Sequence, residues 1–224
     1  MKTALAIFAK TPGLSLVKTR LAADIGVELA EEFYLYSVAA TEEICQNLSN
    51  ESSYIKPYWA LAEKDSGNHK LWENFSTIWT GEGGFGTRLY NIYSSLLKTH
   101  DAVIMIGTDS PQINPAIIYK TIEKLSRKPD SCVFGPAKDG GFYLFGAKRD
   151  LDKNIWESVE YSQNTTLKDL KKKLKQEKIK VILLPENIDV DDAYDLNLLY
   201  SKLKRNKNLL PKQRSLLNWL EKIV

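Results

Sequence analysis

Short runs of almost exclusively apolar residues recur along the chain, and they constrain its fold more than any other feature. Ala4–Ala9 and Ala102–Ile106 are the clearest runs, and each is followed by a polar loop and then by residues at helical spacing. A strand that is apolar on both sides must be covered on both faces of its sheet. Alternating strands and helices are typical of parallel sheets with right-handed crossovers. We therefore predict a three-layer α/β fold, with a mostly parallel central sheet and helices on both faces.

Weaker patterns place the other elements. Further strands are expected at 54–62, 75–80, 132–134, 142–145 and 180–184. Pro57 favours a sheet edge for the first of these, because proline cannot donate to a strand ladder. Apolar residues between Ile25 and Leu48 predict one long amphipathic helix, following a loop over 10–20. Shorter helices are expected at 89–96, 115–125 and 166–177, with two more at the C-terminal end, and a local hairpin joins 132–134 to 142–145. Without a repeat or linker, residues 1–224 are expected to form one domain.

Composition excludes several classes of function. The net charge of +3 on 224 residues is too small to indicate nucleic-acid binding. The lysines of 168–175 alternate with leucines at helical spacing, which is typical of the solvated face of a helix. The apolar run at the start is too short to span a membrane and lacks a cleavage site, so we expect a cytoplasmic protein that binds neither membrane nor nucleic acid.

The cysteines and histidines predict no chemistry of their own. Cys45 and Cys132 are expected to be free buried thiols, because neither has a partner at disulfide or metal-ligand spacing. His69 and His100 stand in polar surroundings without such spacing. A zinc site or a serine–histidine–aspartate triad is therefore poorly supported.

Charged residues and glycines gather where the predicted strands end. In a doubly wound sheet, ligands bind outside the carboxyl ends of the strands, where loops and helix N-termini converge. Two cationic loops that face two acidic ones suit a polyphosphate with a divalent metal between them. The residues at these ends are Lys10, Lys18 and Arg20 after the first strand, Gly81–Gly86 and Arg88 after the third, Asp109 after the fourth, and Asp189–Asp192 after the last.

Each of these groups has a structural alternative. Lys18 and Arg20 could form a surface pair at a helix start, although cations there oppose the helix dipole. Asp109 could cap the helix that follows, and Asp139 could serve only the tight turn Asp139–Gly141. In an extended segment, Asp189 and Asp191 would point to one side, and Asp192 would cap the next helix.

The glycine segment also matches the dinucleotide-binding pattern G-x-G-x-x-G between a strand and a helix. A nicotinamide-dependent enzyme is disfavoured for three reasons. The pattern does not follow the first strand, Glu82 places a negative charge inside the pyrophosphate cradle, and Asp109 is followed at once by Ser110 and Pro111.

Together the motifs resemble a bacterial family of GT-A-like proteins, often labelled glycosyltransferases of the arsenosugar-biosynthesis type. That family is distantly similar to the molybdenum-cofactor and phospholactate guanylyltransferases. The resemblance runs from about residue 6 to 199 with its motifs in the family's order, although Ser15 stands where the family usually has glycine. The matching blocks are Lys10–Pro12, Lys18–Leu21, Gly81–Arg88, Ile106–Pro111, Gly135–Tyr143 and Asp189–Asp191.

The resemblance implies a GT-A, Rossmann-like fold that binds a nucleotide together with Mg²⁺ or Mn²⁺. It implies that Asp109 is a metal ligand and Asp191 a plausible second one, and with Asp139 these form the candidate catalytic set. The candidate nucleotide-binding residues are Lys10, Lys18, Arg20, Gly81, Glu82, Gly86, Arg88 and Asp109.

Three functions stay open at this point. The favoured one is glycosyl transfer from a nucleoside diphosphate-sugar to a small-molecule acceptor. The alternatives are nucleotidyl transfer, in which a phosphorylated acceptor displaces pyrophosphate from a nucleoside triphosphate, and nucleotide binding without catalysis. Glycosyl transfer is favoured because the first loop has a single glycine, Gly13, and bulky residues where a triphosphate would need a compact glycine-rich wrap.

Overall fold

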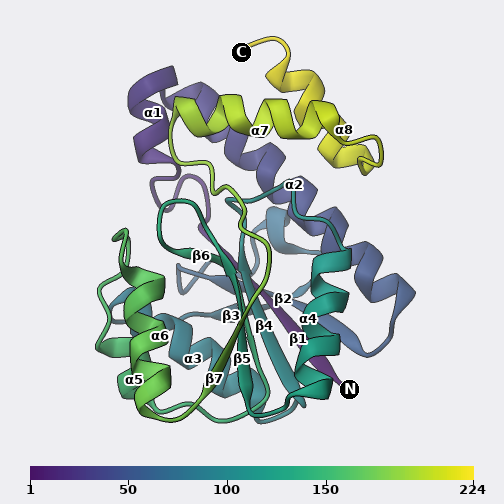
Figure 1. Ribbon diagram of the computed structural model, residues 1–224. Coiled ribbons are helices and arrows are strands. Elements are labelled where there is room, and N and C mark those ends of the chain that lie inside the picture. Colours follow the sequence, from purple (N-terminus) through teal and green to yellow (C-terminus); the bar gives the residue numbers. More distant parts are fainter.

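A computed structural model of residues 1–224 shows a seven-stranded sheet between two layers of helices (Figure 1). The strand order is β3-β2-β1-β4-β6-β5-β7, and only β6 runs antiparallel to its neighbours. The α/β fold and the hairpin between the fifth and sixth strands, both predicted from sequence, are confirmed. The strands are β1 (Thr3–Ala9), β2 (Ile55–Leu61), β3 (Ser76–Trp79), β4 (Ala102–Gly107), β5 (Ser131–Pro136), β6 (Phe142–Ala147) and β7 (Lys180–Leu183).

The helices divide between the two faces of the sheet and one of its ends. The largest apolar cluster lies between the sheet and the helices α2 (Val27–Glu51) and α4 (Ala116–Arg127). A second cluster packs α3 (Phe85–Leu97), α5 (Lys153–Glu157) and α6 (Thr166–Gln176) onto the opposite face. A short 3₁₀ turn, Lys70–Trp72, precedes β3. None of the helices combines the length with the apolar composition that a membrane-spanning segment needs.

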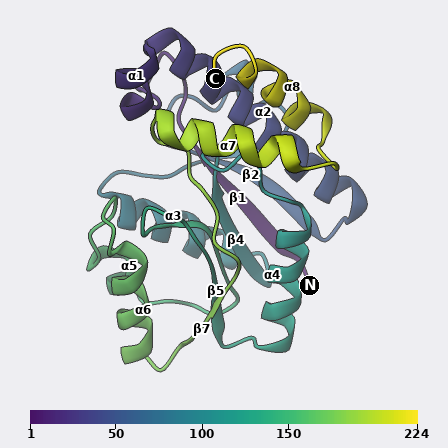
Figure 2. The same cartoon turned by 45° about the horizontal axis from the view of Figure 1, so that its top comes forward.

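A third apolar cluster lies beyond the sheet, where four helices pack together. We call α1 (Thr19–Ile25), α7 (Ala193–Arg205), α8 (Pro211–Leu220) and the part of α2 that contacts them the helical cap. In Figure 2 the cap stands at the top, above the ends of β1 and β4. Trp219 of α8 packs against Phe33 and Tyr36 of α2, with ring centroids 6.2 and 5.5 Å away.

The long helix expected after the first loop is two helices, so that prediction was wrong. Gly26 ends α1 and begins α2 with φ +91° and ψ 154°, a backbone conformation that is essentially restricted to glycine. Apolar spacing continues through the break, which is why it did not show in the pattern. The break turns α1 aside, and α1 begins at Thr19, so Arg20 belongs to a helix and not to the loop.

The expected edge position of Pro57 was also wrong. The strand β2 pairs with β1 along its whole length and with β3 on its other side. However, β3 is only four residues long and pairs from Tyr58 onward, so Pro57 lies beyond its end. The missing N–H of proline is tolerated there because no neighbouring strand lies opposite on that side.

Candidate active site

A cleft of about 530 Å³ opens at the carboxyl ends of the parallel strands, beneath the helical cap. The strand order places the ends of β2 and β3 on one side of β1 and β4, and the turn between β5 and β6 on the other. Because β6 runs antiparallel, that turn reaches the same edge as the ends of the parallel strands. The cleft therefore has two halves, one beside α3 and β1–β3 and the other beside the β5–β6 turn.

Lys18 lines the cleft, and its side chain is almost fully buried. Its backbone is in the left-handed region, with φ 49° and ψ 42°, immediately before α1. Its side chain is 5% exposed and forms an ion pair with Asp109 from the end of β4. The ammonium group also donates to the Val190 carbonyl at 2.6 Å and lies 5.6 Å from the centre of the Phe33 ring. The alternative of a surface charge pair therefore does not apply to Lys18.

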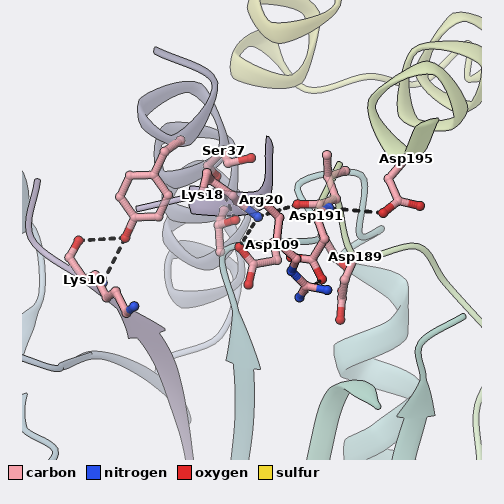
Figure 3. A network of polar contacts seen from close by, with 12 residues as sticks. Lys10, Lys18, Arg20, Ser37, Asp109, Asp189, Asp191 and Asp195 are labelled. Atoms are coloured by element: carbon pink, nitrogen blue, oxygen red, sulfur yellow. Dashed lines mark hydrogen bonds and ion pairs between the residues drawn. The ribbon is translucent and has the colours of Figure 1, made fainter. Parts of the chain in front are cut away.

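A second ion pair lies next to the first, as Figure 3 shows. A guanidinium nitrogen of Arg20 is 2.7 Å from a carboxylate oxygen of Asp191, with the arginine side chain largely exposed. The two pairs join the first loop and α1 to β4 and to the segment before α7. Two of the predicted phosphate-binding cations, Lys18 and Arg20, thus contact the two predicted metal ligands.

Asp189 lies behind these pairs and is held by the loop after β4. The single proton of the Ser110 hydroxyl has two acceptors within reach, the Asp189 carboxylate and, at 2.8 Å, the Ile188 carbonyl. The Val190 amide donates to the Asp109 carbonyl at 2.9 Å. Burial raises the pKa of Asp189 to about 7, and the charge of Asp109 adds to this effect. Asp189 and Asp191 both line the cleft, as alternation in an extended segment predicts.

The pKa of Asp191 is raised as well. Burial raises this pKa most, and the charge of Asp109 raises it further, whereas Lys18 and Arg20 lower it. Asp192 caps α7 by accepting from the Asp195 amide at 2.9 Å, as expected. Four aspartates line the cleft, and the two ion pairs neutralise only Asp109 and Asp191.

Lys10 and Arg88 bring positive charge to the half of the cleft beside α3. Both line the cleft, and neither side chain forms an ion pair. The backbone of Lys10 is fixed by Tyr34, whose hydroxyl accepts from the Lys10 amide at 2.9 Å and donates to its carbonyl at 2.7 Å. The guanidinium of Arg88 uses one nitrogen, Nε, to donate to the Gly83 carbonyl at 3.1 Å. These two cations remain available to an anionic ligand.

The glycine segment contributes less to the cleft than its pattern suggests. Gly81, Glu82 and Gly86 are not among the lining residues, and their roles in nucleotide binding stay predictions. Gly86 lies inside α3, where a Cβ atom would come within 2.3 Å of the Trp156 carbonyl oxygen. Close packing of α3 on α5 therefore requires a glycine at this position whatever the ligand.

Sequence reasoning did not identify the aromatic residues of the cleft. Phe85, at the start of α3, is 50% exposed, and its ring lies 6.2 Å from that of Phe8 and 5.2 Å from that of Tyr161. All three line the cleft. A large apolar side chain directly after a glycine segment was a usable signal for Phe85. No local pattern distinguished Tyr161, which lies in an irregular segment between α5 and α6.

Two carboxylates of the cleft suit a divalent metal ion whose other ligands are phosphate oxygens of a bound nucleotide and water. No group of three or more histidine, cysteine or acidic side chains is arranged to hold a metal ion alone. Mg²⁺ commonly takes one or two carboxylates together with phosphate oxygens and water. Asp109 and Asp191 could supply that pair, because both line the cleft and the charge of one raises the pKa of the other. A cation between them would relieve this repulsion.

Comparison with known proteins supports the fold. A family model described as "Uncharacterized protein conserved in bacteria (DUF2064)" matches residues 53–163, just under half of the chain. No curated protein is similar in sequence. A protein from Desulfovibrio desulfuricans G20, described as a candidate nucleotide-diphospho-sugar transferase, has 22% identity and a TM-score of 0.86; the match covers 99% of this chain and 96% of that one.

Two enzymes of known chemistry have the same architecture at lower similarity. A cytidylyltransferase from Leptospira borgpetersenii has 11% identity and a TM-score of 0.55, with 100% of this chain and 95% of the other covered. Glucosyl-3-phosphoglycerate synthase from Mycobacterium tuberculosis, in complex with Mn²⁺, UDP and phosphoglyceric acid, has 9% identity and a TM-score of 0.52, with 90% and 74% covered. The chain thus has the Rossmann-like fold shared by nucleotide-diphospho-sugar transferases and cytidylyltransferases.

Proposed function

We propose that this chain is a metal-dependent transferase that uses a nucleotide-activated donor, specifically a glycosyltransferase that uses a nucleoside diphosphate-sugar. The observation that carries this proposal is the pairing of Lys18 with Asp109 and Arg20 with Asp191 across one cleft. Such a cluster of fixed cations and carboxylates at the strand ends suits a diphosphate and a divalent cation together.

The donor is expected to bind with its nucleotide beside α3. Lys10 and Arg88, the two cations there without an ion-pair partner, offset the charge of the diphosphate. Phe85 and Phe8 offer apolar ring surface to the base or the ribose. Asp109 and Asp191 would hold Mg²⁺ or Mn²⁺, which would stabilise the departing diphosphate.

The reaction would then break the bond between the anomeric carbon and the diphosphate oxygen while an acceptor hydroxyl attacks that carbon. Asp139 lines the cleft at the β5–β6 turn, and its Oδ1 accepts from the Gly141 amide at 2.8 Å. Its other oxygen has no hydrogen-bond partner in the protein and could accept the acceptor's proton. Lys18, fixed by Asp109 and the Val190 carbonyl, would keep the carboxylates in place.

Glycosyl transfer is preferred over nucleotidyl transfer because of the charge that remains free. Two of the four cations in the cleft are already paired, which leaves Lys10 and Arg88. That number suits a diphosphate better than a triphosphate. The first loop also presents Leu14 and Leu16, which are largely exposed, where a triphosphate would need a close wrap of backbone amides. Nucleotidyl transfer is the second candidate, supported by the fold shared with a cytidylyltransferase.

A binding screen followed by product analysis tests the proposal. Thermal shift with nucleotides and nucleotide-sugars, with and without Mn²⁺, should find a ligand that stabilises the protein by about 2.7 kcal/mol at a hundred times its dissociation constant. Incubation with the sugar donors should then release a nucleoside diphosphate. Pyrophosphate release from a nucleoside triphosphate and a sugar phosphate, with no nucleoside diphosphate from any donor, would establish the second candidate.

The variant Asp109→Asn separates function from folding. It should abolish the Mn²⁺-dependent part of the nucleotide shift and lower the melting temperature of the ligand-free protein only slightly, because the asparagine oxygen can still accept a hydrogen bond from the buried Lys18 ammonium group. Unfolding of the ligand-free variant would assign Asp109 a structural role. Binding of nucleotide without turnover of any donor would identify a binding protein without catalysis.

A further inference from the structure

We infer that the acceptor is a neutral or cationic hydroxyl compound, such as a polyol or an amino sugar, and not a phosphorylated or carboxylated one. The inference rests on the proposed glycosyl transfer and names the class of its second substrate. It is drawn from the half of the cleft beside the β5–β6 turn.

Charge is divided between the two halves of the cleft. Lys18 and Arg20 are neutralised by their ion pairs with Asp109 and Asp191. The lining cations that remain, Lys10 and Arg88, come from the end of β1 and from α3. In the half beside the β5–β6 turn, the lining contains Asp139 but no lysine or arginine. The other polar residues of this half include Tyr161, Ser162 and Gln163.

Asp139 faces the same space as the other carboxylates. It lines the same cleft as Asp109, Asp189 and Asp191, and no ion pair neutralises it. The lysine next to it in sequence does not compensate. Lys138 is exposed and lies outside the cleft lining. A phosphate or carboxylate on the acceptor would meet this negative field without a counter-charge.

The remaining wall of this half is aromatic and uncharged. Phe142 and Tyr161 line it, and the Tyr161 ring packs edge-on against Phe85. The Tyr161 hydroxyl donates to the Trp156 carbonyl at 3.0 Å, which holds the ring in place. Ring faces next to a carboxylate suit the C–H face and hydroxyl groups of a sugar, or an ammonium group. Recognition of phosphate or carboxylate instead requires arginine, lysine or a set of backbone amides.

Matched acceptor pairs test the inference directly. Recombinant protein, Mn²⁺ and UDP-glucose or GDP-mannose are incubated with glycerol or glycerol 3-phosphate, with glucose or glucose 6-phosphate, and with glucosamine or gluconate. The neutral or cationic member of each pair should give a kcat/KM at least about tenfold higher, the size of one unfavourable charge contact in a partly screened site. Preference for the anionic members would overturn the inference while leaving glycosyl transfer in place.

A charge reversal at the turn shows whether the discrimination arises there. Asp139→Lys should lower turnover but shift the ratio between glucose 6-phosphate and glucose at least about fivefold towards the phosphate, because it replaces repulsion by attraction. Asp139→Asn, which retains a side-chain acceptor for the Gly141 amide, should shift the ratio less. Asp130→Lys, an exposed change at the other end of β5, is the matched control and should leave the ratio unchanged.

The failures of the two proposals are distinguishable. Release of nucleoside diphosphate from donor alone, by slow hydrolysis, reports glycosyl transfer independently of the acceptor. If the donor is hydrolysed but Asp139→Lys leaves the ratio between glucose 6-phosphate and glucose unchanged, the acceptor class is rejected and glycosyl transfer stands. No hydrolysis of any donor would reject glycosyl transfer and the acceptor class with it.

Discussion

Lys18 shows how one residue serves both the stability and the chemistry of this protein. Its side chain is 5% exposed, and its ammonium group is held by a carboxylate, a carbonyl and a ring face. A buried charge is tolerated only when it is paired and hydrogen-bonded. Arg20, two residues further on, makes a similar ion pair with its side chain 68% exposed. The two residues therefore differ in what their loss should cost the fold.

Replacement of each cation by alanine should separate these contributions. Lys18→Ala should lower the free energy of unfolding by about 1–2 kcal/mol, because it removes a charged hydrogen bond to a buried carbonyl. Arg20→Ala should change it by less than about 0.5 kcal/mol, as expected of an exposed pair. Both should weaken Mn²⁺-dependent nucleotide binding about tenfold or more, because each holds one proposed metal ligand in place. Urea denaturation and calorimetry measure the two quantities; equal stability losses would contradict the assigned difference in burial.

His100 should make stability depend on pH. Burial lowers its pKa below the ordinary value of 6.5, and Lys2 and Lys56 act in the same direction. The unfolded chain therefore binds a proton before the folded protein does, so stability is complete above about pH 6.5 and falls as the pH falls below it. Between pH 7.5 and 5.5 the native protein should lose more free energy of unfolding than His100→Gln. Identical losses in the two proteins would exclude His100 as a source.

At the scale of elements, the break at Gly26 sets the direction of α1 and hence the place of Arg20. A Cβ atom on Gly26 would meet nothing within 4 Å, so any effect of substitution comes from the backbone alone. Gly26→Ala should cost about 1–3 kcal/mol of unfolding free energy, the range for a residue forced into a glycine conformation. Gly84→Ala, with φ −69° and equally open surroundings, should cost about 0.5 kcal/mol. Equal costs would mean that α1 readily reorients.

The elements that the sequence predicted are those whose pattern is local. Ala102–Ile106 is apolar at every position and forms a strand buried on both faces. Gly26 and Pro57 were misjudged because their effect depends on a helix break and on the length of a neighbouring strand. The strand-end residues Lys10, Arg88 and Asp109 could be placed together because parallel strands end at one edge. The pairing of Lys18 with Asp109 could not, since the two lie 91 positions apart and meet only through tertiary packing.

At the scale of the whole molecule, the helical cap is tied to the site by side chains as well as by apolar packing. Gln213 of α8 is buried and donates to the carbonyls of Pro111 and Ile113, at 2.9 and 3.2 Å. These residues belong to the loop that follows Asp109. The C-terminal helix therefore holds the loop of a proposed metal ligand that precedes it by about one hundred residues.

Gln213→Met should test this connection with little change in volume. Two buried carbonyls would lose their partner, which should lower the free energy of unfolding by about 1–3 kcal/mol. Mn²⁺-dependent nucleotide binding should weaken as the loop of Asp109 loosens, whereas Mn²⁺-independent binding should change less. The exposed Gln176→Met is the matched control. A stability loss without any effect on the Mn²⁺ dependence would limit Gln213 to a structural role.

The position of β1 in the middle of the sheet has a consequence for synthesis of the chain. This strand is entirely apolar from Ala4 to Ala9 and pairs with β2 on one side and β4 on the other. About one hundred residues separate it from β4, so at roughly 5–20 residues per second the ribosome needs about 5–20 s to deliver that partner. During this interval a hydrophobic strand with an unpaired edge is exposed outside the ribosome. Nascent chains of this protein should therefore depend on chaperones most strongly between the emergence of β1 and that of β4.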